Sequence, residues 1–257
     1  MTQILLTQLA VIVIYMTAWY LVSQALRRFD VADIAWGPGF IISAFTAAVA
    51  VSERLNPRAY LVMALVMAWG MRLSLHVYIR NRGKPEDARY RAWRQEWGKN
   101  ANIRSFLQIF MLQGLLLLLI SLPITSVMMA DSSAFTLLDA AGLLIWTTGF
   151  LFEAIGDWQL LRFNKDPMHK GRIIKTGLWR FSRHPNYFGE VTLWWGIYLI
   201  ALSSGASWPV IIGPLTITFL ILKVSGIPML EKKYEGNPEF EAYRRRTSAF
   251  FPLPPKS

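Results

Sequence analysis

The residues with the clearest chemical potential form one short run, FSRHPNYFGE at positions 181–190. Pro185 suits the first position of a helix, because its missing N–H would have no intrahelical partner there. Ser182 and Arg183 then lie just ahead of a helix N-terminus. The free N–H groups and the positive dipole end of such a terminus favour a phosphate. The run therefore predicts an anion-binding helix start.

Two polar residues follow inside the same predicted helix. Asn186 and Glu190 are four residues apart, so they share one helix face. The rest of this helix is nearly all apolar, and an acid one turn into it should meet a ligand or a partner side chain rather than lipid. The alternative is that His184, Tyr187 and Arg183 simply anchor the chain at a membrane surface.

A buried cation is expected further upstream. Arg72 and His76 are four apart in the apolar run 59–79. A guanidinium at that depth is costly, by at least about 2.5 kcal/mol, so it needs an anionic partner. The candidate partners are a ligand phosphate or one of Asp33, Glu153, Asp157 and Glu190. A structural ion pair between helices and a hydrogen-bonded core histidine are the alternatives to catalytic roles.

Asp33 lies just ahead of the sequence Gly37-Pro38-Gly39, which should kink or interrupt a helix. Broken helices are tolerated at depth where they line a cavity. Burial would favour a protonated Asp33 that donates to a carbonyl oxygen, whereas a nearby Arg72 would keep it ionised. Asp33 is expected to face the same cavity as Glu190. The alternative is that Asp33 only caps the helix.

A second acidic pair, Glu153 and Asp157, also has a spacing of four. Two carboxylates on one helix face repel each other unless donors lie between them. They therefore suggest a donor-rich ligand, such as ribose hydroxyls or an exocyclic amine. Pairing with Arg162 or Arg72 is the alternative.

These residues must be held by membrane-spanning helices. Runs of roughly 17–25 apolar residues read as spans, and seven occur, at 4–26, 34–51, 59–79, 105–129, 137–156, 187–203 and 209–228. The first has no basic segment before it and is expected to be retained. The predicted fold is an all-α integral membrane protein with seven transmembrane helices, forming a single membrane domain over 1–257.

The charges give this fold an orientation. Of the 27 Lys and Arg residues, 23 fall in the odd-numbered loops and the tail, which makes the N-terminus periplasmic and the C-terminus cytoplasmic. This segregation accounts for the net charge of +11 without nucleic-acid binding. The chain has no Cys, so thiolate chemistry is excluded. The sequence also contains no paired-His zinc motif, so no metal site is predicted.

Two polar segments remain. Residues 86–104 are rich in Arg, Tyr and Trp, which is typical of an amphipathic helix on an anionic leaflet. The alternative is a lid over a charged cofactor. The tail 231–251 is charged but contains several aromatic residues, so it is expected to fold back on the cytoplasmic face.

Over about its whole length, and most strongly in its second half, the chain resembles the steroid 5-alpha-reductase family, in its bacterial branch. The matching features are GL at 177–178, Asn186, GE at 189–190, NRGKP at 81–85 and the FEAY tail at 240–243. The resemblance implies seven helices in the bacterial inner membrane and NADPH held on the cytoplasmic side. Hydride would pass to the beta carbon of a lipophilic enone, so the enzyme would be an oxidoreductase acting on CH–CH groups.

The resemblance also implies site residues. The cofactor would contact Asp157, Asn186 and Glu190, with Arg183, His184, Tyr187 and Tyr243 as further contacts. The basic residues Arg162, Arg172 and Arg246 would bind its phosphates. Asp33, with Arg72 and His76, would serve catalysis in a substrate half at 1–104, opposite a cofactor half at 105–257.

One departure keeps alternatives open. The family places a Tyr on the third helix, where this chain has Trp69 or Gly70. The HPNY run at 184–187 also resembles isoprenylcysteine carboxyl methyltransferases and phospholipid methyltransferases, which bind S-adenosylmethionine. A non-catalytic lipid-binding protein is a third alternative.

The charge distribution generates a topology prediction. At the C-terminus, a reporter that works only in the cytoplasm should be active. Near Ser132, a reporter that works only in the periplasm should be active. The reverse pattern would contradict both the orientation and the cytoplasmic cofactor site. Paired phosphatase and fluorescent-protein fusions measure this directly.

Overall fold

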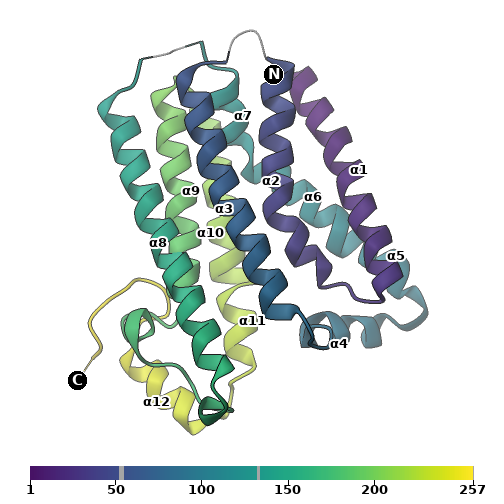
Figure 1. The fold of residues 1–257 in the computed structure, drawn as a ribbon, viewed down its shortest axis with the longest axis vertical. Helices are drawn as coiled ribbons and strands as arrows, with labels where there is room; N and C mark the ends of the chain where they lie inside the picture. The colour runs from purple at the N-terminus through teal and green to yellow at the C-terminus, as the bar shows by residue number, and fades with distance from the viewer. Residues whose placement is uncertain (52–54, 132–133, 257) are drawn as a thin grey trace. The chain divides into compact units, whose positions relative to one another are not determined.

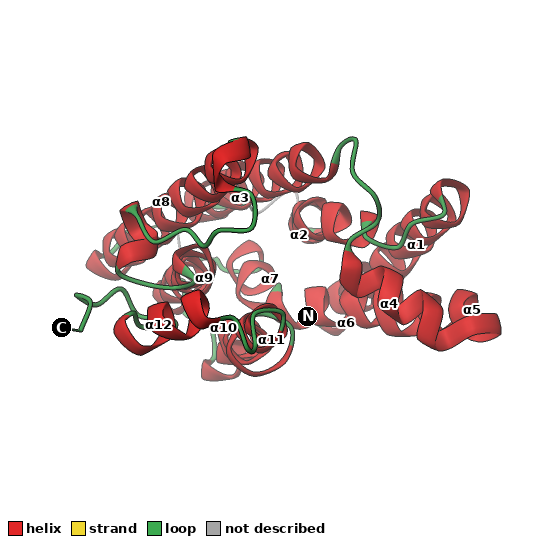
Figure 2. Cartoon of the chain, turned by 90° about the horizontal axis from the view of Figure 1, so that it is seen from below, coloured by secondary structure: helices red, strands yellow, loops and turns green. Residues whose placement is uncertain are grey.

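The computed structural model describes residues 1–51, 55–131 and 134–256 (Figure 1). Arg54 and Ser132, which enter the topology argument, lie outside these ranges. The described residues form helices, turns and loops, with no strand (Figure 2). They divide into two compact units. Unit 1 contains Met1–Phe135 and Ala201–Ile212, and unit 2 contains Thr136–Ile200 and Gly213–Ser257.

The α-helices follow the apolar runs of the sequence closely. They are α1 (Thr2–Leu26), α2 (Val31–Ala50), α3 (Pro57–Asn81), α4 (Ala88–Trp97), α5 (Ala101–Ser105), α6 (Leu112–Ile120), α7 (Leu122–Met128), α8 (Leu137–Lys165), α9 (Pro185–Ser203), α10 (Ile212–Phe219), α11 (Ile227–Lys232) and α12 (Pro238–Arg246). The all-helical prediction is confirmed for the described residues.

Six helical segments of the described chain are long and apolar enough to cross a membrane. They correspond to six of the seven expected spans, and they indicate a multi-pass membrane protein. The remaining expected span, 187–203, is present as α9 but is not among the six. Its first turns carry Asn186 and Glu190, which lower its apolar character, so seven spans stay a prediction.

In unit 1, α2 runs between α1 and α3 (Figure 1). Pro38 lies inside α2, which continues uninterrupted from Val31 to Ala50. Of the two expected outcomes, a kink or an interruption, the interruption at residues 37–39 does not occur. Pro38 cannot donate to the carbonyl of Ile34, but Ser74 on α3 donates its hydroxyl to that oxygen at 2.7 Å. A neighbouring helix thus satisfies the group that proline leaves open.

The α2–α3 contact also depends on glycine. A Cβ at Gly37 would meet the carbonyl oxygen of Gly70, and a Cβ at Gly70 would lie 2.7 Å from the carbonyl oxygen of Gly37. No larger residue fits at either position without separating the helices. Trp69, next to Gly70, is 1% exposed and packs edge-to-face on Phe40 at a ring-centroid distance of 5.4 Å.

In unit 2, α8 and α9 pack through glycines repeated every seven residues. Built on their backbones, a Cβ at Gly142 would lie 2.8 Å from the oxygen of Gly196, and one at Gly149 would lie 2.6 Å from the oxygen of Gly189. Gly156 continues the series, with Asn186 N at 3.2 Å. Small residues at such a seam let two backbones approach closely.

The end of unit 2 is closed by the tail. Arg183 N donates to Ser248 O at 2.8 Å, and Leu253 N donates to Phe181 O at 3.0 Å. Ser182 Oγ donates to Phe250 O at 2.8 Å. The tail is therefore folded back onto residues 181–183, as expected from its aromatic content.

The glycine seam generates a stability prediction. Gly149→Ala should lower the melting temperature, although alanine favours helix by about 1 kcal/mol, because the new methyl would overlap the α9 backbone. An overpacking cost of about 1–3 kcal/mol is expected. Thermal unfolding of the purified protein measures it.

Gly114→Ala on α6 is the matched control, since its Cβ would meet side-chain atoms of Ile12 and Met16 at 3.2 Å rather than backbone. Equal losses of melting temperature in the two variants would contradict close backbone packing of α8 and α9 at Gly149.

Candidate functional site

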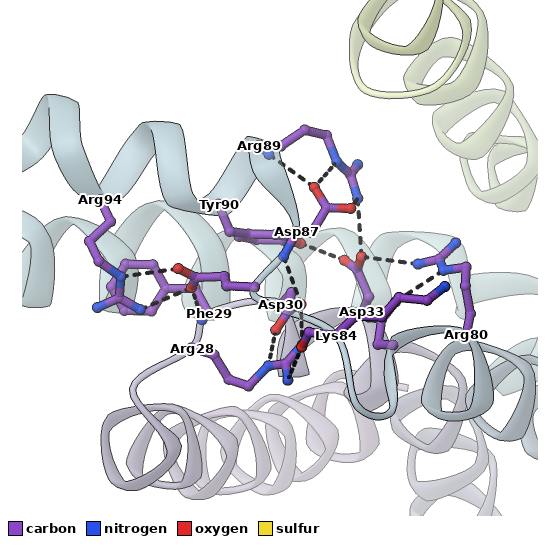
Figure 3. Close-up of polar contacts among 12 residues, drawn as sticks. Arg28, Phe29, Asp30, Asp33, Arg80, Lys84, Asp87, Arg89, Tyr90 and Arg94 are labelled. Atoms are coloured by element: carbon purple, nitrogen blue, oxygen red, sulfur yellow. Dashed lines mark hydrogen bonds and ion pairs between the residues drawn. The ribbon is translucent and has the colours of Figure 1, made fainter. Parts of the chain in front are cut away.

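Asp33 is the centre of a polar cluster in unit 1 (Figure 3). Its carboxylate accepts the hydroxyl proton of Tyr90 on one oxygen. The other oxygen accepts Arg89 Nη2 at 3.2 Å and lies 3.9 Å from Arg80 Nη2. These partners come from the end of α3 and the start of α4. Arg72, for which Asp33 was one of several candidate partners, is not among these contacts, and the alternative that Asp33 caps α2 is not observed.

Asp30, which the sequence analysis did not select, is more buried than Asp33. Its side chain is 1% exposed, and both oxygens accept from Arg28, each at 2.7 Å. The Asp87 amide donates to the same carboxylate at 3.0 Å. The short Arg28-x-Asp30 spacing was visible in the sequence, but the link to Asp87, 57 residues away, was not.

Residues 84–94 are attached to this cluster by further contacts (Figure 3). The Phe29 amide donates to Glu86 Oε1 at 2.6 Å, and Glu86 pairs with Arg94 Nη2 at 2.9 Å. The Arg94 guanidinium lies 3.7 Å from the centroid of the Phe29 ring. We call residues 84–97 the clasp, because they close over the start of α2.

The clasp is also stabilised by the cap of α4. Asp87 accepts from the Arg89 amide at 2.9 Å and from Arg89 Nε at 3.0 Å. Burial alone would raise the pKa of Asp87, but the hydrogen bonds and charge of Arg89 outweigh it and hold that pKa below its usual value. Asp87 therefore stays ionised, and the cap persists, well into acidic solution.

The other predicted catalytic residues of unit 1 lie on α3. Arg72 and His76 are half-buried and one turn apart, consistent with the shared face expected from their spacing. Asp33 belongs to the same unit, but the clasp and not these two residues surrounds its carboxylate.

In unit 2, the α8–α9 seam brings together residues that are far apart in sequence. Asn186 Nδ2 donates to Asp157 Oδ1 at 3.0 Å. The Asn186 Oδ1 atom is buried and accepts no hydrogen bond from the described residues. Glu153 and Asp157 are 2% and 7% exposed, and Gly189, beside Glu190, abuts Glu153. We call Glu153, Asp157, Asn186 and Glu190 the seam cluster.

The two basic residues ahead of α9 have protein partners. Arg183 forms two hydrogen bonds to Glu231, at 2.8 and 3.1 Å, and donates to the carbonyl oxygens of Arg244 and Thr247 at 3.2 and 2.5 Å. His184 Nε2 lies 3.0 Å from the same Glu231. The geometry makes Arg183 and His184 anchors of α11 and the tail, and the phosphate role predicted for them finds no support in these contacts.

Tyr243 has a similar structural position. Its hydroxyl donates to the Trp179 carbonyl oxygen, and the residue is 6% exposed. Burial raises the pKa of Tyr243 above its usual value, against the opposing charge of Arg183. Tyr187 stacks on His184 with ring centroids 5.6 Å apart.

The remaining predicted phosphate ligands are exposed. Arg162 lies over the Trp158 ring at 5.6 Å, and Arg246 donates to Lys256 O at 3.3 Å. Arg172 is exposed in the loop after α8. Because α8 turns by about 100° per residue, Arg162 lies about 140° around the axis from Asp157. The structure therefore does not bring Arg162 to the seam cluster.

No group of three or more His, Cys, Asp or Glu that could hold a metal ion occurs among the described residues. The clusters described above offer carboxylates, the Asn186 amide and the buried phenols of Tyr90 and Tyr243.

The fold and these clusters define a helical multi-pass membrane protein with polar side chains buried near helix ends. The chain belongs to the family described as Protein of unknown function (DUF1295), whose model matches residues 19–247. It is similar to an uncharacterized protein of the fission yeast Schizosaccharomyces pombe, with 29% identity over 226 residues. The match covers 76% of this chain and 64% of the yeast protein. No solved structure matches the chain.

The clasp generates a prediction for Asp30. Asp30→Asn should destabilise the protein by about 1–3 kcal/mol, because hydrogen bonds from a guanidinium to a buried carboxylate are lost. It should also speed tryptic cleavage after the arginines of the clasp. Thermal unfolding and limited proteolysis measure the two effects.

Glu96→Gln is the control, since Glu96 is an exposed acid on α4, within the clasp. If Asp30→Asn behaves like Glu96→Gln, the clasp does not depend on Asp30.

Proposed function

We propose that this protein is a membrane-embedded, NADPH-dependent reductase of a lipophilic, conjugated substrate. The resemblance to steroid 5-alpha-reductases motivates the activity, and the family match over residues 19–247 includes both polar clusters. The observation that carries the proposal is the hydrogen bond from Tyr90 to Asp33. Reduction of an enone needs a proton donor at the carbonyl or alpha carbon, whereas methyl transfer from S-adenosylmethionine needs no such acid.

The Tyr90–Asp33 hydrogen bond could also replace the tyrosine that the family places on the third helix. Trp69 and Gly70 cannot donate a phenolic proton, but Tyr90, on α4, places a phenol against the Asp33 carboxylate. Tyr90 is 4% exposed, so water competes little for its hydroxyl. We propose that Asp33 orients Tyr90 and that the Tyr90 hydroxyl turns to the substrate oxygen when the substrate binds. Two arginines near Asp33 favour this orienting role over proton donation by Asp33 itself.

The seam cluster fits a nicotinamide cofactor by its hydrogen-bonding chemistry. The Asn186 Oδ1 atom is a buried acceptor without a donor, and such a group is costly unless a ligand supplies one. The carboxylates of Asp157 and Glu190 are further acceptors for ribose hydroxyls or a carboxamide. NADPH, when bound, supplies the hydride, and the seam cluster would orient the cofactor.

One observation favours a second candidate, an S-adenosylmethionine-dependent methyltransferase. Arg183 and His184 are both paired with Glu231, so the basic residues just ahead of α9 are engaged within the protein. Three of the four members of the seam cluster are acids, and carboxylates attract the sulfonium cation of S-adenosylmethionine. A non-catalytic lipid-binding protein would need neither ligand.

The orientation of the chain in the membrane is proposed from its charge pattern. We propose a C-terminus in the cytoplasm, so that both clusters meet the cytoplasmic nucleotide pool, and a bacterial inner membrane as the location. The fission-yeast relative shows that similar proteins are not confined to bacteria. That Asp33 and Glu190 face one cavity stays a prediction.

The cofactor proposal predicts selective stabilisation. NADP(H) should raise the melting temperature of the purified protein more than S-adenosylmethionine does, following RT ln(1 + [L]/Kd). Asn186→Ala and Glu190→Gln should each reduce that shift, because each removes a proposed hydrogen-bond partner.

Lys170→Gln, a change at an exposed basic residue that has no proposed role, tests whether surface charge alone produces the shift. A shift with S-adenosylmethionine only would favour the methyltransferase, and no shift with any nucleotide would favour the lipid-binding alternative.

The proton-donor proposal predicts a loss of turnover without a loss of cofactor binding. Tyr90→Phe and Asp33→Asn should each lower kcat by roughly 10²–10⁴-fold, the usual contribution of general acid catalysis. Reductase assays on a panel of lipophilic enones measure turnover, and the NADP(H) thermal shift measures binding.

Tyr78→Phe is the control, since Tyr78 is exposed on α3. Full activity of Tyr90→Phe would contradict the assignment.

A further inference from the structure

A cavity of about 420 Å³ lies in unit 2, outside the seam cluster. Its walls are the last two turns of α8 and residues 174–177. The polar and charged lining residues are Gln159, Arg162, Asp166, His169 and Thr176, and the aromatic ones are Trp158 and Phe163. The volume lies within the range of small-ligand sites.

The cavity faces away from the α8–α9 seam. Trp158, Arg162 and Asp166 follow Asp157 by one, five and nine residues, which places them about 100–180° around the helix from it. Burial agrees, because Asp157 is 7% exposed and Trp158 is 56% exposed. A ligand in this cavity would therefore be separate from one held by the seam cluster.

The wall of the cavity is shaped by local contacts. His169 stacks on Phe163 with ring centroids 4.1 Å apart, and its Nδ1 lies 3.5 Å from Asp166 Oδ2. Gln159 Oε1 accepts from the Leu178 amide at 3.0 Å, next to Gly177, whose φ is +62°. The α8 end and the following loop are thus held together by their own contacts, without a ligand.

Arg162 is the cation of this cavity. It forms no hydrogen bond or ion pair with the part of the chain that the structure describes, and its one contact is the Trp158 ring at 5.6 Å. Other arginines of unit 2, such as Arg183, are fully engaged. A guanidinium held over an indole at a cavity wall has its donors available for a bidentate phosphate contact.

We propose that this cavity binds a phosphate group carried on an apolar or aromatic body, with Arg162 as its ligand. Its position, where the apolar helix α8 gives way to a basic loop, matches the level of lipid phosphates. An anionic phospholipid headgroup is the source that this position favours. The proposal does not depend on the reductase activity.

The test is binding of soluble phosphate-bearing probes to the full chain in neutral detergent. Dihexanoyl phosphatidylglycerol should raise the melting temperature with saturation, and Arg162→Gln should weaken its apparent affinity about tenfold, the usual effect of one lost charge-assisted contact. Dihexanoyl phosphatidylcholine and AMP serve as the comparison probes.

Arg180→Gln is the matched control. Arg180 is also an exposed arginine over an aromatic ring, with Phe181 at 6.0 Å, but it does not line the cavity. The apparent affinity of the Arg180→Gln protein for dihexanoyl phosphatidylglycerol should stay within about twofold of the wild-type value, which is a small change in binding free energy.

The outcomes separate the sources. An Arg162-dependent shift with phosphatidylglycerol supports a lipid headgroup, and one with AMP supports a nucleotide phosphate. The site is overturned if no probe shifts the protein, or if Arg162→Gln and Arg180→Gln weaken binding equally.

Discussion

The close approach of α8 and α9 is the constraint on which the candidate cofactor site depends. Glycines repeat every seven residues on both helices, and each lies against backbone of the other helix. Because no side chain separates the helices, Glu153 and Asp157 are brought against the first turns of α9. In lipid there is no hydrophobic driving force between helices, so this packing comes from backbone contact and from buried polar pairs such as Asp157–Asn186.

The charged groups at the helix ends obey a related constraint. A buried ion is tolerated when it is paired and hydrogen-bonded, and both units meet this condition with residues from distant segments. In unit 1, the clasp supplies Arg89 and Tyr90 to Asp33. In unit 2, Glu231 holds Arg183, which in turn holds the tail. These pairs engage the charged groups at the helix ends, whereas the Asn186 Oδ1 atom and the Arg162 guanidinium form no hydrogen bond within the described part of the chain.

Local patterns predicted the elements but not their pairings. Pro185 correctly marked the start of α9, and the acidic pair on α8 shares one face as its spacing required. Asp157–Asn186, Asp30–Asp87 and Arg183–Glu231 join residues 29, 57 and 48 positions apart, and no local period encodes such contacts. Two expectations show the same limit. A kink or an interruption was expected at Gly37-Pro38-Gly39, but α2 continues because Ser74, 40 residues from Ile34, donates to the open carbonyl oxygen. Arg183 was expected to bind phosphate; in the structure it pairs with Glu231 of α11, and no local pattern indicated that partner.

A nicotinamide dinucleotide held by the seam cluster should remain bound during gentle purification. Mass spectrometry of the small molecules released on denaturing the protein would then detect NADP(H) from the wild type. The same measurement should find none from Asn186→Leu, which removes the buried acceptor. Recovery of S-adenosylmethionine or its demethylated product, or of the same dinucleotide from the Asn186→Leu protein, would contradict this assignment.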